Sequence, residues 1–244
     1  IAMKTIGVIP CRYQSSRFPG KPLALIGGKP MMWHVYQRAL ESDVLNEVYI
    51  ATDDDRIVAV ANEYNLNTVM TSSSHETGTD RVAEVAGKID ADYYVNIQGD
   101  EPFINPKTIR AVAQAMIDCD DSSIQSINTC TLMQDIENVD DMNTVKVIMD
   151  VNQRLLALSR YPIPYSIRGV VRHYKHLGLY AFKKSGLQVF NKKTPATLEK
   201  TESIEMYRLL ENGYGIQMIE ATDASISVDT PDDLERVREQ FLNG

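Results

Sequence analysis

Thr5-Ile6-Gly7-Val8-Ile9 is a short, apolar and β-branched run that leads directly into a loop rich in Arg, Ser, Gly and Pro. Such a run, bounded by turn-forming residues, is typical of a buried strand that feeds a loop. From Pro30 onwards apolar residues recur at helical spacing, and Val48-Tyr49-Ile50-Ala51-Thr52 is again strand-like. This order predicts a βαβ unit at the start of the chain.

The alternation of helical and strand-like segments continues after this unit. We expect helices over 57–64, 79–88 and 106–118, and strands over 68–71 and 93–97. Strands separated by helices predict an α/β fold with a doubly wound, mostly parallel sheet and helices on both faces. Ligands of such sheets bind beyond the carboxyl ends of the strands. Because Arg12, Asp53 and Gln98-Gly99-Asp100 each follow a strand, we expect them to share one edge of the sheet.

The pattern changes after residue 124. Short strand-like runs cover 124–132, 145–149 and 155–159, and mixed polar and apolar residues follow over 174–182. These runs predict a smaller antiparallel lobe. With no linker or repeat in the chain, we expect a single domain over 3–244, to which about 124–190 contributes the lobe.

Two further helices are expected near the C-terminus. One covers 201–212 and stops at Gly213, a residue typical of helix ends. The other begins after Thr230, a good N-cap, with Pro231 in the first helical position. In this last helix Leu234, Val237 and Phe241 are expected to face inward.

Composition excludes several classes of protein. The 244 residues carry a net charge of −8, which disfavours nucleic acid or an anionic membrane as the main partner. No run approaches the roughly 18 apolar residues of a membrane helix. The three cysteines, Cys11, Cys119 and Cys130, are widely spaced, which argues against a disulfide framework or a zinc cluster. We therefore expect a cytoplasmic protein, and any phosphate pocket must be local.

The loop after the first strand is the strongest local signal of function. It places Arg12, Arg17 and Lys21 within ten positions, together with Gly20. Arginine forks and a lysine ammonium bind phosphate oxygens, and glycine permits close backbone approach. A solvated basic loop is the alternative. The loop is neither a Walker A motif nor the glycine fingerprint of a nicotinamide-dependent dehydrogenase, which sets that class of enzyme aside.

A second signal is a carboxylate directly after the strand over 93–97. Asp100 is a plausible ligand for Mg²⁺, which prefers a few carboxylate oxygens together with phosphate and water. Asp229 is a candidate second ligand. The alternatives are that Glu101 is the ligand, that Asp100 is a turn residue, and that Asp229 caps a helix or binds a loop.

Along nearly its whole length, from Ile9 to the final helix, the chain resembles the CMP-Kdo synthetases, the 3-deoxy-manno-octulosonate cytidylyltransferases. The order and spacing of the motifs carry this resemblance. The motifs are the Arg12/Arg17/Lys21 loop, Ala51-Thr52-Asp53, His75-Glu76-Thr77-Gly78-Thr79-Asp80-Arg81, Gln98-Gly99-Asp100-Glu101-Pro102, Thr144-Val145-Lys146-Val147, Ser159-Arg160 with Ile163-Pro164, Lys175-His176-Leu177-Gly178-Leu179-Tyr180, and Val228-Asp229-Thr230-Pro231-Asp232-Asp233-Leu234.

The resemblance implies a Mg²⁺-dependent, homodimeric enzyme that couples CTP to 3-deoxy-manno-octulosonate (Kdo). The products would be CMP-sugar, for lipopolysaccharide or capsule synthesis, and pyrophosphate. It implies phosphate contacts by Arg12, Arg17 and Lys21, cytidine contacts by Thr79, Arg81 and Gln98, and metal binding by Asp100 and Asp229. It further implies that Arg160, His176, Tyr180 and Glu205 face the sugar.

Three of these implied roles have structural alternatives. Arg81 could form an ion pair on a helix surface, His176 could be a core histidine with satisfied hydrogen bonds, and Tyr180 could serve packing alone. A non-catalytic nucleotide-binding regulator is a different class of function. That class predicts the loss of the carboxylates or of the loop cations, yet Asp100 and Lys21 are both present.

One position departs from the family pattern. Where these enzymes carry Leu-Glu-Gln near the sugar, this chain has Ile204-Glu205-Met206. Methionine cannot donate a hydrogen bond to a sugar hydroxyl. If Met206 lines the pocket, a related acidic sugar such as 8-amino-Kdo becomes a candidate substrate. Alternatively, the helix is rotated so that Met206 packs in the core.

Overall fold

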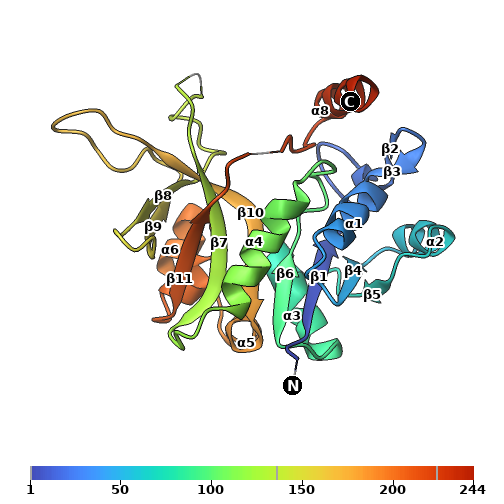
Figure 1. Ribbon diagram of the computed structural model, residues 1–244, viewed down its shortest axis with the longest axis horizontal. Coiled ribbons are helices and arrows are strands. Elements are labelled where there is room, and N and C mark those ends of the chain that lie inside the picture. The colour runs from blue at the N-terminus through green and yellow to red at the C-terminus, as the bar shows by residue number, and fades with distance from the viewer. Residues whose placement is uncertain (1, 136, 224) are drawn as a thin grey trace.

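Four parallel strands form the N-terminal half of the central sheet. In the computed structural model, which describes residues 2–135, 137–223 and 225–244, these strands lie in the order β5-β4-β1-β6 (Figure 1). Their bounds are Thr5–Pro10 for β1, Glu47–Thr52 for β4, Thr68–Met70 for β5 and Tyr93–Asn96 for β6. The predicted βαβ organisation is confirmed.

The C-terminal half of the chain extends the same sheet. Next to β6 lie β10 (Tyr174–Lys183), β7 (Ile124–Leu132) and β11 (Gly215–Glu220), and only β10 in this row is antiparallel to its neighbours. An antiparallel pair, β8 (Lys146–Met149) and β9 (Leu155–Ser159), branches from the start of β10. The α/β fold class is therefore confirmed. However, β7 and β10 belong to the main sheet, and β8 and β9 form the antiparallel extension.

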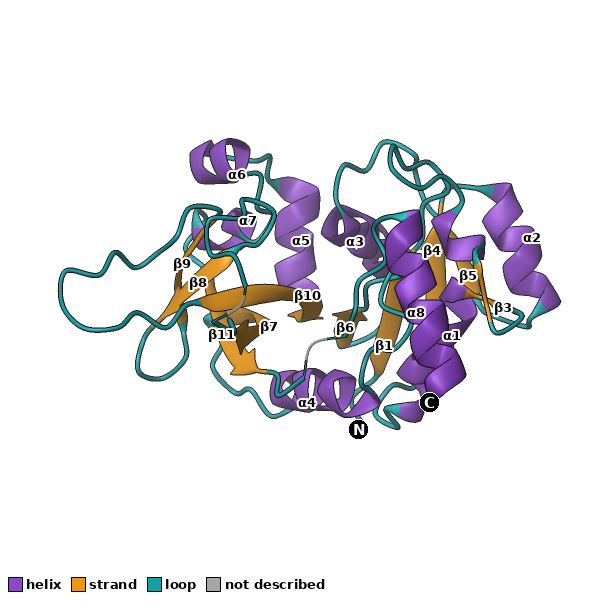
Figure 2. Ribbon diagram, turned by 90° about the horizontal axis from the view of Figure 1, so that it is seen from above, coloured by secondary structure: helices purple, strands orange, loops and turns teal. Residues whose placement is uncertain are grey.

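Helices cover both faces of this sheet (Figure 2). One face carries α1 (Met31–Glu41), α2 (Asp55–Glu63) and α4 (Pro106–Ile117). The other carries α3 (Gly78–Lys88), α5 (Lys184–Lys192) and α7 (Tyr207–Leu210), with α6 (Thr197–Glu202) beside them. None of the described helices combines the length and apolarity that crossing a membrane requires.

Alternation along β1 supplies both cores. Ile6 and Val8 pack under α3, whereas Ile9 packs under α1 and α4, and all three are fully buried. Successive side chains of a strand point to opposite faces, so a strand covered on both faces must be apolar throughout. The apolar character of β1 thus follows from its position in the middle of the sheet.

The last helix, α8 (Pro231–Asn243), packs against the hairpin of β2 (Leu25–Ile26) and β3 (Lys29–Pro30). Thr230 caps it as predicted, in a capping box with Asp233. Leu234 and Val237 are buried as predicted. Phe241 is 41% exposed, but its ring lies against the hairpin turn beside His34 and Phe103, so it also faces the body of the molecule.

The predicted helix over 201–212 is broken. α6 ends at Glu202, Ser203 adopts the left-handed conformation with φ 54°, and α7 begins at Tyr207. Helix propensity along this segment gave no sign of the break, whereas Gly213, with φ 81°, ends the segment as expected. β11 and α5 also lie in segments for which no element was predicted.

Arg208 on α7 holds the helices of one face together. Its guanidinium forms a two-point ion pair with Glu199, with Nε to Oε2 at 2.6 Å and Nη2 to Oε1 at 2.8 Å. Arg208 and Glu199 are only 4% and 6% exposed, and Arg208 Nη1 lies 3.6 Å from Asp80 Oδ1 on α3. A buried ion pair contributes little compared with apolar packing, but breaking one leaves an unpaired buried charge.

We therefore expect Arg208→Met to lower the free energy of unfolding by about 3–5 kcal/mol. Urea unfolding measures this loss, and the double variant Arg208→Met, Glu199→Leu should recover most of it. Lys4→Met is the matched control, because it breaks a solvent-exposed pair with Glu47 and should cost far less than the buried pair. Equal losses for Arg208→Met and Lys4→Met would contradict the role of the buried pair.

Candidate functional site

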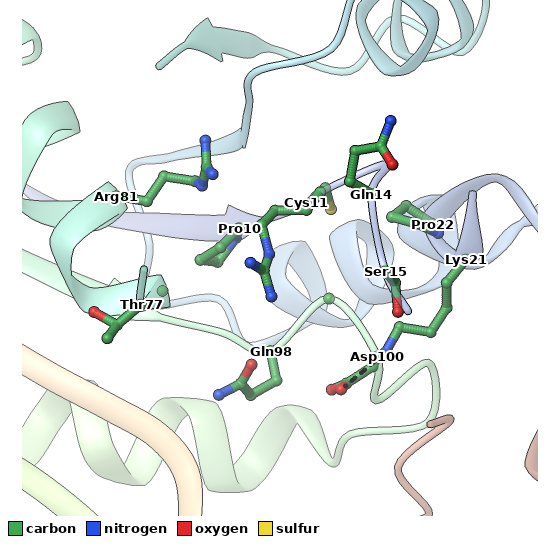
Figure 3. A pocket seen from close by; sticks show the side chains of 13 residues that line it. Pro10, Cys11, Gln14, Ser15, Lys21, Pro22, Thr77, Arg81, Gln98 and Asp100 are labelled. Atoms are coloured by element: carbon green, nitrogen blue, oxygen red, sulfur yellow. Dashed lines mark hydrogen bonds and ion pairs between the residues drawn. The ribbon is translucent and has the colours of Figure 1, made fainter. Parts of the chain in front are cut away.

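A polar cavity of about 160 Å³ opens at the carboxyl ends of β1 and β6 (Figure 3). It lies between the loop that follows β1 and the start of α3, at the sheet edge where the sequence predicts the ligand. Its lining residues are Pro10, Cys11, Arg12, Gln14, Ser15, Lys21, Pro22, Thr77, Gly78, Arg81, Gln98, Gly99 and Asp100.

The loop after β1 is closed on itself and supported from α2. The Gly20 N–H donates to the Tyr13 carbonyl at 2.8 Å, and Gly20 adopts φ 70°. The Arg56 guanidinium stacks on the Tyr13 ring, 3.3 Å from its centroid, and pairs with Asp54 at 2.7 Å. These contacts of Arg56 with Asp54 and Tyr13 thus fix the backbone from which the basic side chains project.

The predicted cations take different positions around the cavity. Arg12, Lys21 and Arg81 line it. The Arg17 side chain is 67% exposed and does not line it, and its Nη2 lies 3.7 Å from Asp229 Oδ1. Arginine and lysine side chains converging on one cavity favour an anionic ligand.

Arg81 is not part of a surface ion pair, because it is only 1% exposed. Its Nη1 donates to Thr71 and to the Ser72 carbonyl, while Nη2 lies 3.9 Å from Asp53 Oδ2. Among the described residues, Arg81 Nη2 and the buried Thr79 Oγ1 have no hydrogen-bond partner. Burial lowers the pKa of Arg81. Buried polar atoms without partners are rare in proteins and favour a bound ligand that would pair with them.

The start of α3 belongs to the site, although the sequence interpretation named only Thr79 and Arg81 from it. Thr77 caps the helix by accepting from the Asp80 N–H, and Gly78 lines the cavity. Free N–H groups at a helix start attract anions. The spacing Thr77-x-x-Asp80 is a capping signal that could have located this helix start. Gly99 lines the cavity as part of the predicted Gln98-Gly99-Asp100 segment, and Gln14 and Ser15 line it although the sequence assigned neither a role of its own.

Two carboxylates lie within ion-pair distance of Lys21 at one side of the cavity. Lys21 Nζ lies 3.3 Å from Asp100 Oδ2 and 3.9 Å from Asp229 Oδ1. The Val228 N–H donates to the Asp100 carbonyl at 2.8 Å, which holds the segment carrying Asp229 beside the end of β6. Burial and then the proximity of Asp229 raise the pKa of Asp100, although Lys21 opposes this shift. The Asp229 carboxylate faces these side chains, whereas Thr230 is the helix cap.

Glu101 points elsewhere. Its carboxylate accepts from Ser225 and lines a separate, smaller cavity, and burial raises its pKa to about 7. The structure therefore favours Asp100 over Glu101 as the carboxylate of the main cavity. Among the described residues no three His, Cys, Asp or Glu side chains converge as a closed metal cage. A pair of carboxylates fits Mg²⁺, which keeps water and phosphate oxygens as its other ligands.

Three of the residues predicted to face the sugar, His176, Tyr180 and Glu205, do not line this cavity. His176 and Tyr180 stack at 5.1 Å on β10, and His176 Nε2 lies 2.8 Å from Asn128 Oδ1. Burial lowers the pKa of His176 to about 4, so the ring is neutral near pH 7. Glu205 accepts from the Thr79 N–H at 3.4 Å, and burial raises the pKa of Glu205.

Arg160 and Met206 are placed away from the cavity. The Arg160 guanidinium donates to the backbone carbonyls of Met142, Glu202 and Ser203. Met206 is 0% exposed and belongs to the core beneath α3 and α5. The structure thus favours the packing interpretation of Met206, and Arg160 ties the end of β9 to α6.

Comparison with known proteins agrees with this geometry. The cytidylyltransferase family model matches residues 6–221. The 3-deoxy-manno-octulosonate cytidylyltransferase of Geobacter metallireducens is 42% identical over 255 residues, covering 98% of each chain. That of Leptospira interrogans is 44% identical over 239 residues, covering 98% of this chain and 96% of the relative.

A solved structure agrees as well. It is a CMP:2-keto-3-deoxy-manno-octonic acid synthetase complexed with CTP, which superposes with a TM-score of 0.92 at 40% identity and covers 98% of this chain and 99% of the other. Similarity of this extent covers the elements that border the cavity, including β1, β6 and α3. The chain belongs to the 3-deoxy-manno-octulosonate cytidylyltransferase family of cytidylyltransferases.

Proposed function

We propose that this protein transfers CMP from CTP to Kdo, releasing pyrophosphate. The observation that carries the proposal is the cavity at the end of β1 and β6, which is lined by three cations, a helix start and Asp100, with Asp229 beside Lys21. The activity for which the relatives are named supplies the substrate class, and the residues of this cavity supply groups suited to a nucleoside triphosphate.

The nucleotide would lie with its phosphates between the β1 loop and Lys21. Arg12 would complete the anion site, and Gly78 at the start of α3 also lines this space. The buried, partnerless Nη2 of Arg81 suits the polar edge of a cytosine ring, and Gln98 lies across the cavity from Arg81 (Figure 3). This division assigns the phosphates to one end of the cavity and the base to the other.

In the proposed reaction the anomeric hydroxyl of the sugar attacks the α-phosphorus of CTP in line. The anomeric oxygen bonds to the α-phosphorus and its proton passes to solvent, while the bond from the α-phosphorus to the oxygen that bridges it to the β-phosphorus breaks and pyrophosphate leaves. Asp100 and Asp229 would hold Mg²⁺, which supplies charge neutralisation for the phosphates. Arg12 and Lys21 add fixed positive charge, so positioning and electrostatics suffice without a protein nucleophile.

On the sugar side, neutral hydrogen-bonding groups are available. His176 is neutral near pH 7, and Tyr180 lies against its ring. We assign His176 to binding and not to proton transfer, because a group with a pKa of about 4 is a poor base near pH 7.

The first test is pyrophosphate release by the purified protein with CTP and Mg²⁺, comparing Kdo, 8-amino-Kdo and a sialic acid. We expect release with Kdo, because Met206 lies in the core and removes no hydrogen bond from the sugar. Release with 8-amino-Kdo alone would instead favour the related sugar.

Met206→Gln separates the two interpretations further. An amide at this fully buried position should lower the free energy of unfolding by about 1–3 kcal/mol and leave the substrate profile unchanged. A gain in activity on Kdo without loss of stability would mean that residue 206 faces the sugar.

Asp100→Asn tests the carboxylate pair. We expect kcat to fall about a thousandfold or more, because the change removes a charge at the proposed metal site and no core volume. Pyrophosphate release measures the loss, and thermal unfolding checks that the variant folds. Ser225→Ala, which changes only the partner of Glu101, is a nearby control that should keep most activity. Normal turnover of folded Asp100→Asn would refute the role.

We also propose a homodimer built on the arm between β9 and β10. This arm extends away from the body of the molecule (Figure 1). On it Tyr161, Tyr165, Ile167 and Val170 are 75%, 87%, 86% and 96% exposed. Apolar side chains gathered on a projecting segment are typical of an interaction surface.

The double variant Tyr165→Asp, Ile167→Asp should therefore dissociate to monomers in sedimentation velocity, because desolvating the added charges is unfavourable. Leu242→Asp, on the 81% exposed end of α8, is the control and should leave the mass unchanged. A wild-type monomer at all protein concentrations would contradict the proposal.

A further inference from the structure

Lys21 contacts both carboxylates of the site, which points to a role beyond phosphate binding. We propose that its ammonium acts as an exchangeable counter-ion. It holds Asp100 and Asp229 together before a divalent cation is present, and it moves to the triphosphate once that cation and the nucleotide are bound. This inference rests on the proposed function for the identity of the nucleotide, but not for the contact between Lys21 and the carboxylates.

The Lys21 ammonium lies close to both carboxylates. Lys21 Nζ lies 3.3 Å from Asp100 Oδ2 and 3.9 Å from Asp229 Oδ1. The Lys21 and Asp100 side chains are only 19% and 22% exposed, so water screens this contact less than a surface pair. Arg17 also approaches the pair, but it reaches Asp229 only and is 67% exposed.

The two carboxylates carry like charges that need a counter-ion. Asp100 follows β6, whereas Asp229 arrives more than a hundred residues later on the segment before α8. Two carboxylates brought together repel each other unless a cation lies between them. The backbone contact from Val228 to Asp100 fixes the approach of this segment but neutralises nothing. Lys21 supplies the missing positive charge in the nucleotide-free protein.

The Lys21 side chain can reach both the carboxylates and the cavity. Lys21 begins a short 3₁₀ turn, η1 (Lys21–Leu23), directly after Gly20, whose position the Tyr13 contact fixes. The Lys21 side chain also lines the cavity with Gln14 and Ser15 (Figure 3). A lysine ammonium on a flexible four-carbon stem can therefore turn from the carboxylates to a phosphate without moving the loop. Arginine, with a rigid fork, would be less suited to this exchange.

If Lys21 exchanges in this way, Lys21→Met should raise the affinity for Mg²⁺ and lower the affinity for the nucleotide. Without nucleotide, Mg²⁺ should bind this variant about tenfold more tightly than the wild type, because no ammonium competes for the carboxylates. With Mg²⁺ present, a non-hydrolysable CTP analogue should bind about tenfold more weakly, because a phosphate contact is lost. Isothermal titration calorimetry measures both affinities. In thermal unfolding, EDTA should lower the midpoint of Lys21→Met more than that of the wild type, and Mg²⁺ should restore it.

Two controls accompany these measurements. Lys4→Met removes a lysine from an ordinary surface pair with Glu47, at 2.8 Å, and should leave Mg²⁺ binding unchanged. Adding Asp100→Asn to Lys21→Met should abolish the gain in Mg²⁺ affinity, because it removes one of the two carboxylates.

Equal or weaker Mg²⁺ binding by Lys21→Met overturns the exchange, and so does the absence of measurable binding by both proteins. A loss of stability that Mg²⁺ does not restore would mean that Lys21 is only a structural ion pair. These outcomes are distinct from failure of the proposed function. Tighter Mg²⁺ binding by Lys21→Met without pyrophosphate release from any sugar would support the exchange and refute the activity.

Discussion

The close approach of the carboxyl ends of β1 and β6 is the constraint on which the site depends. A Cβ atom at Gly99 would lie 2.8 Å from the Pro10 carbonyl oxygen and 3.1 Å from Cys11 Sγ, so only glycine allows the two chain segments to leave the sheet side by side. The Ile97 N–H extends their pairing by donating to the Val8 carbonyl at 2.9 Å. Because the segments stay together, the basic loop after β1 and the carboxylate after β6 line one cavity.

A second constraint comes from β10, the antiparallel member of the main row of strands. Its pairing with β7 shifts between His176 and Tyr180, which is a bulge of the kind that redirects side chains near binding sites. At the bulge, the Asn96 side chain donates to the Gly178 carbonyl at 3.2 Å, and a Cβ atom at Gly178 would lie 2.5 Å from Gln98 Nε2. Glycine at this position therefore lets β10 bring His176 and Tyr180 up to the end of a strand that runs the opposite way.

The sequence predicts what depends on local pattern and misses what depends on tertiary contacts. Apolar periodicity located β1, β4 and β6, and parallel topology then placed Arg12 and Asp100 at one edge of the sheet. The approach of Asp229 to Lys21 could be expected only from family resemblance, because it depends on a long connection across the fold. The packing of Met206 was left open, because a helical pattern does not reveal a break at Ser203. The capping signal at Thr77 was present in the sequence, but only the position of the cavity shows that this helix start belongs to the site.

The break at Ser203 connects stability with the site. Because α6 ends there, Met206 turns into the core while the preceding Glu205 reaches the first turn of α3 and accepts from the Thr79 N–H. The same short segment carries Arg208, whose guanidinium lies 3.6 Å from Asp80, also in the first turn of α3. The helix start that borders the cavity is thus held by contacts from the half of the chain that also carries the residues assigned to the sugar.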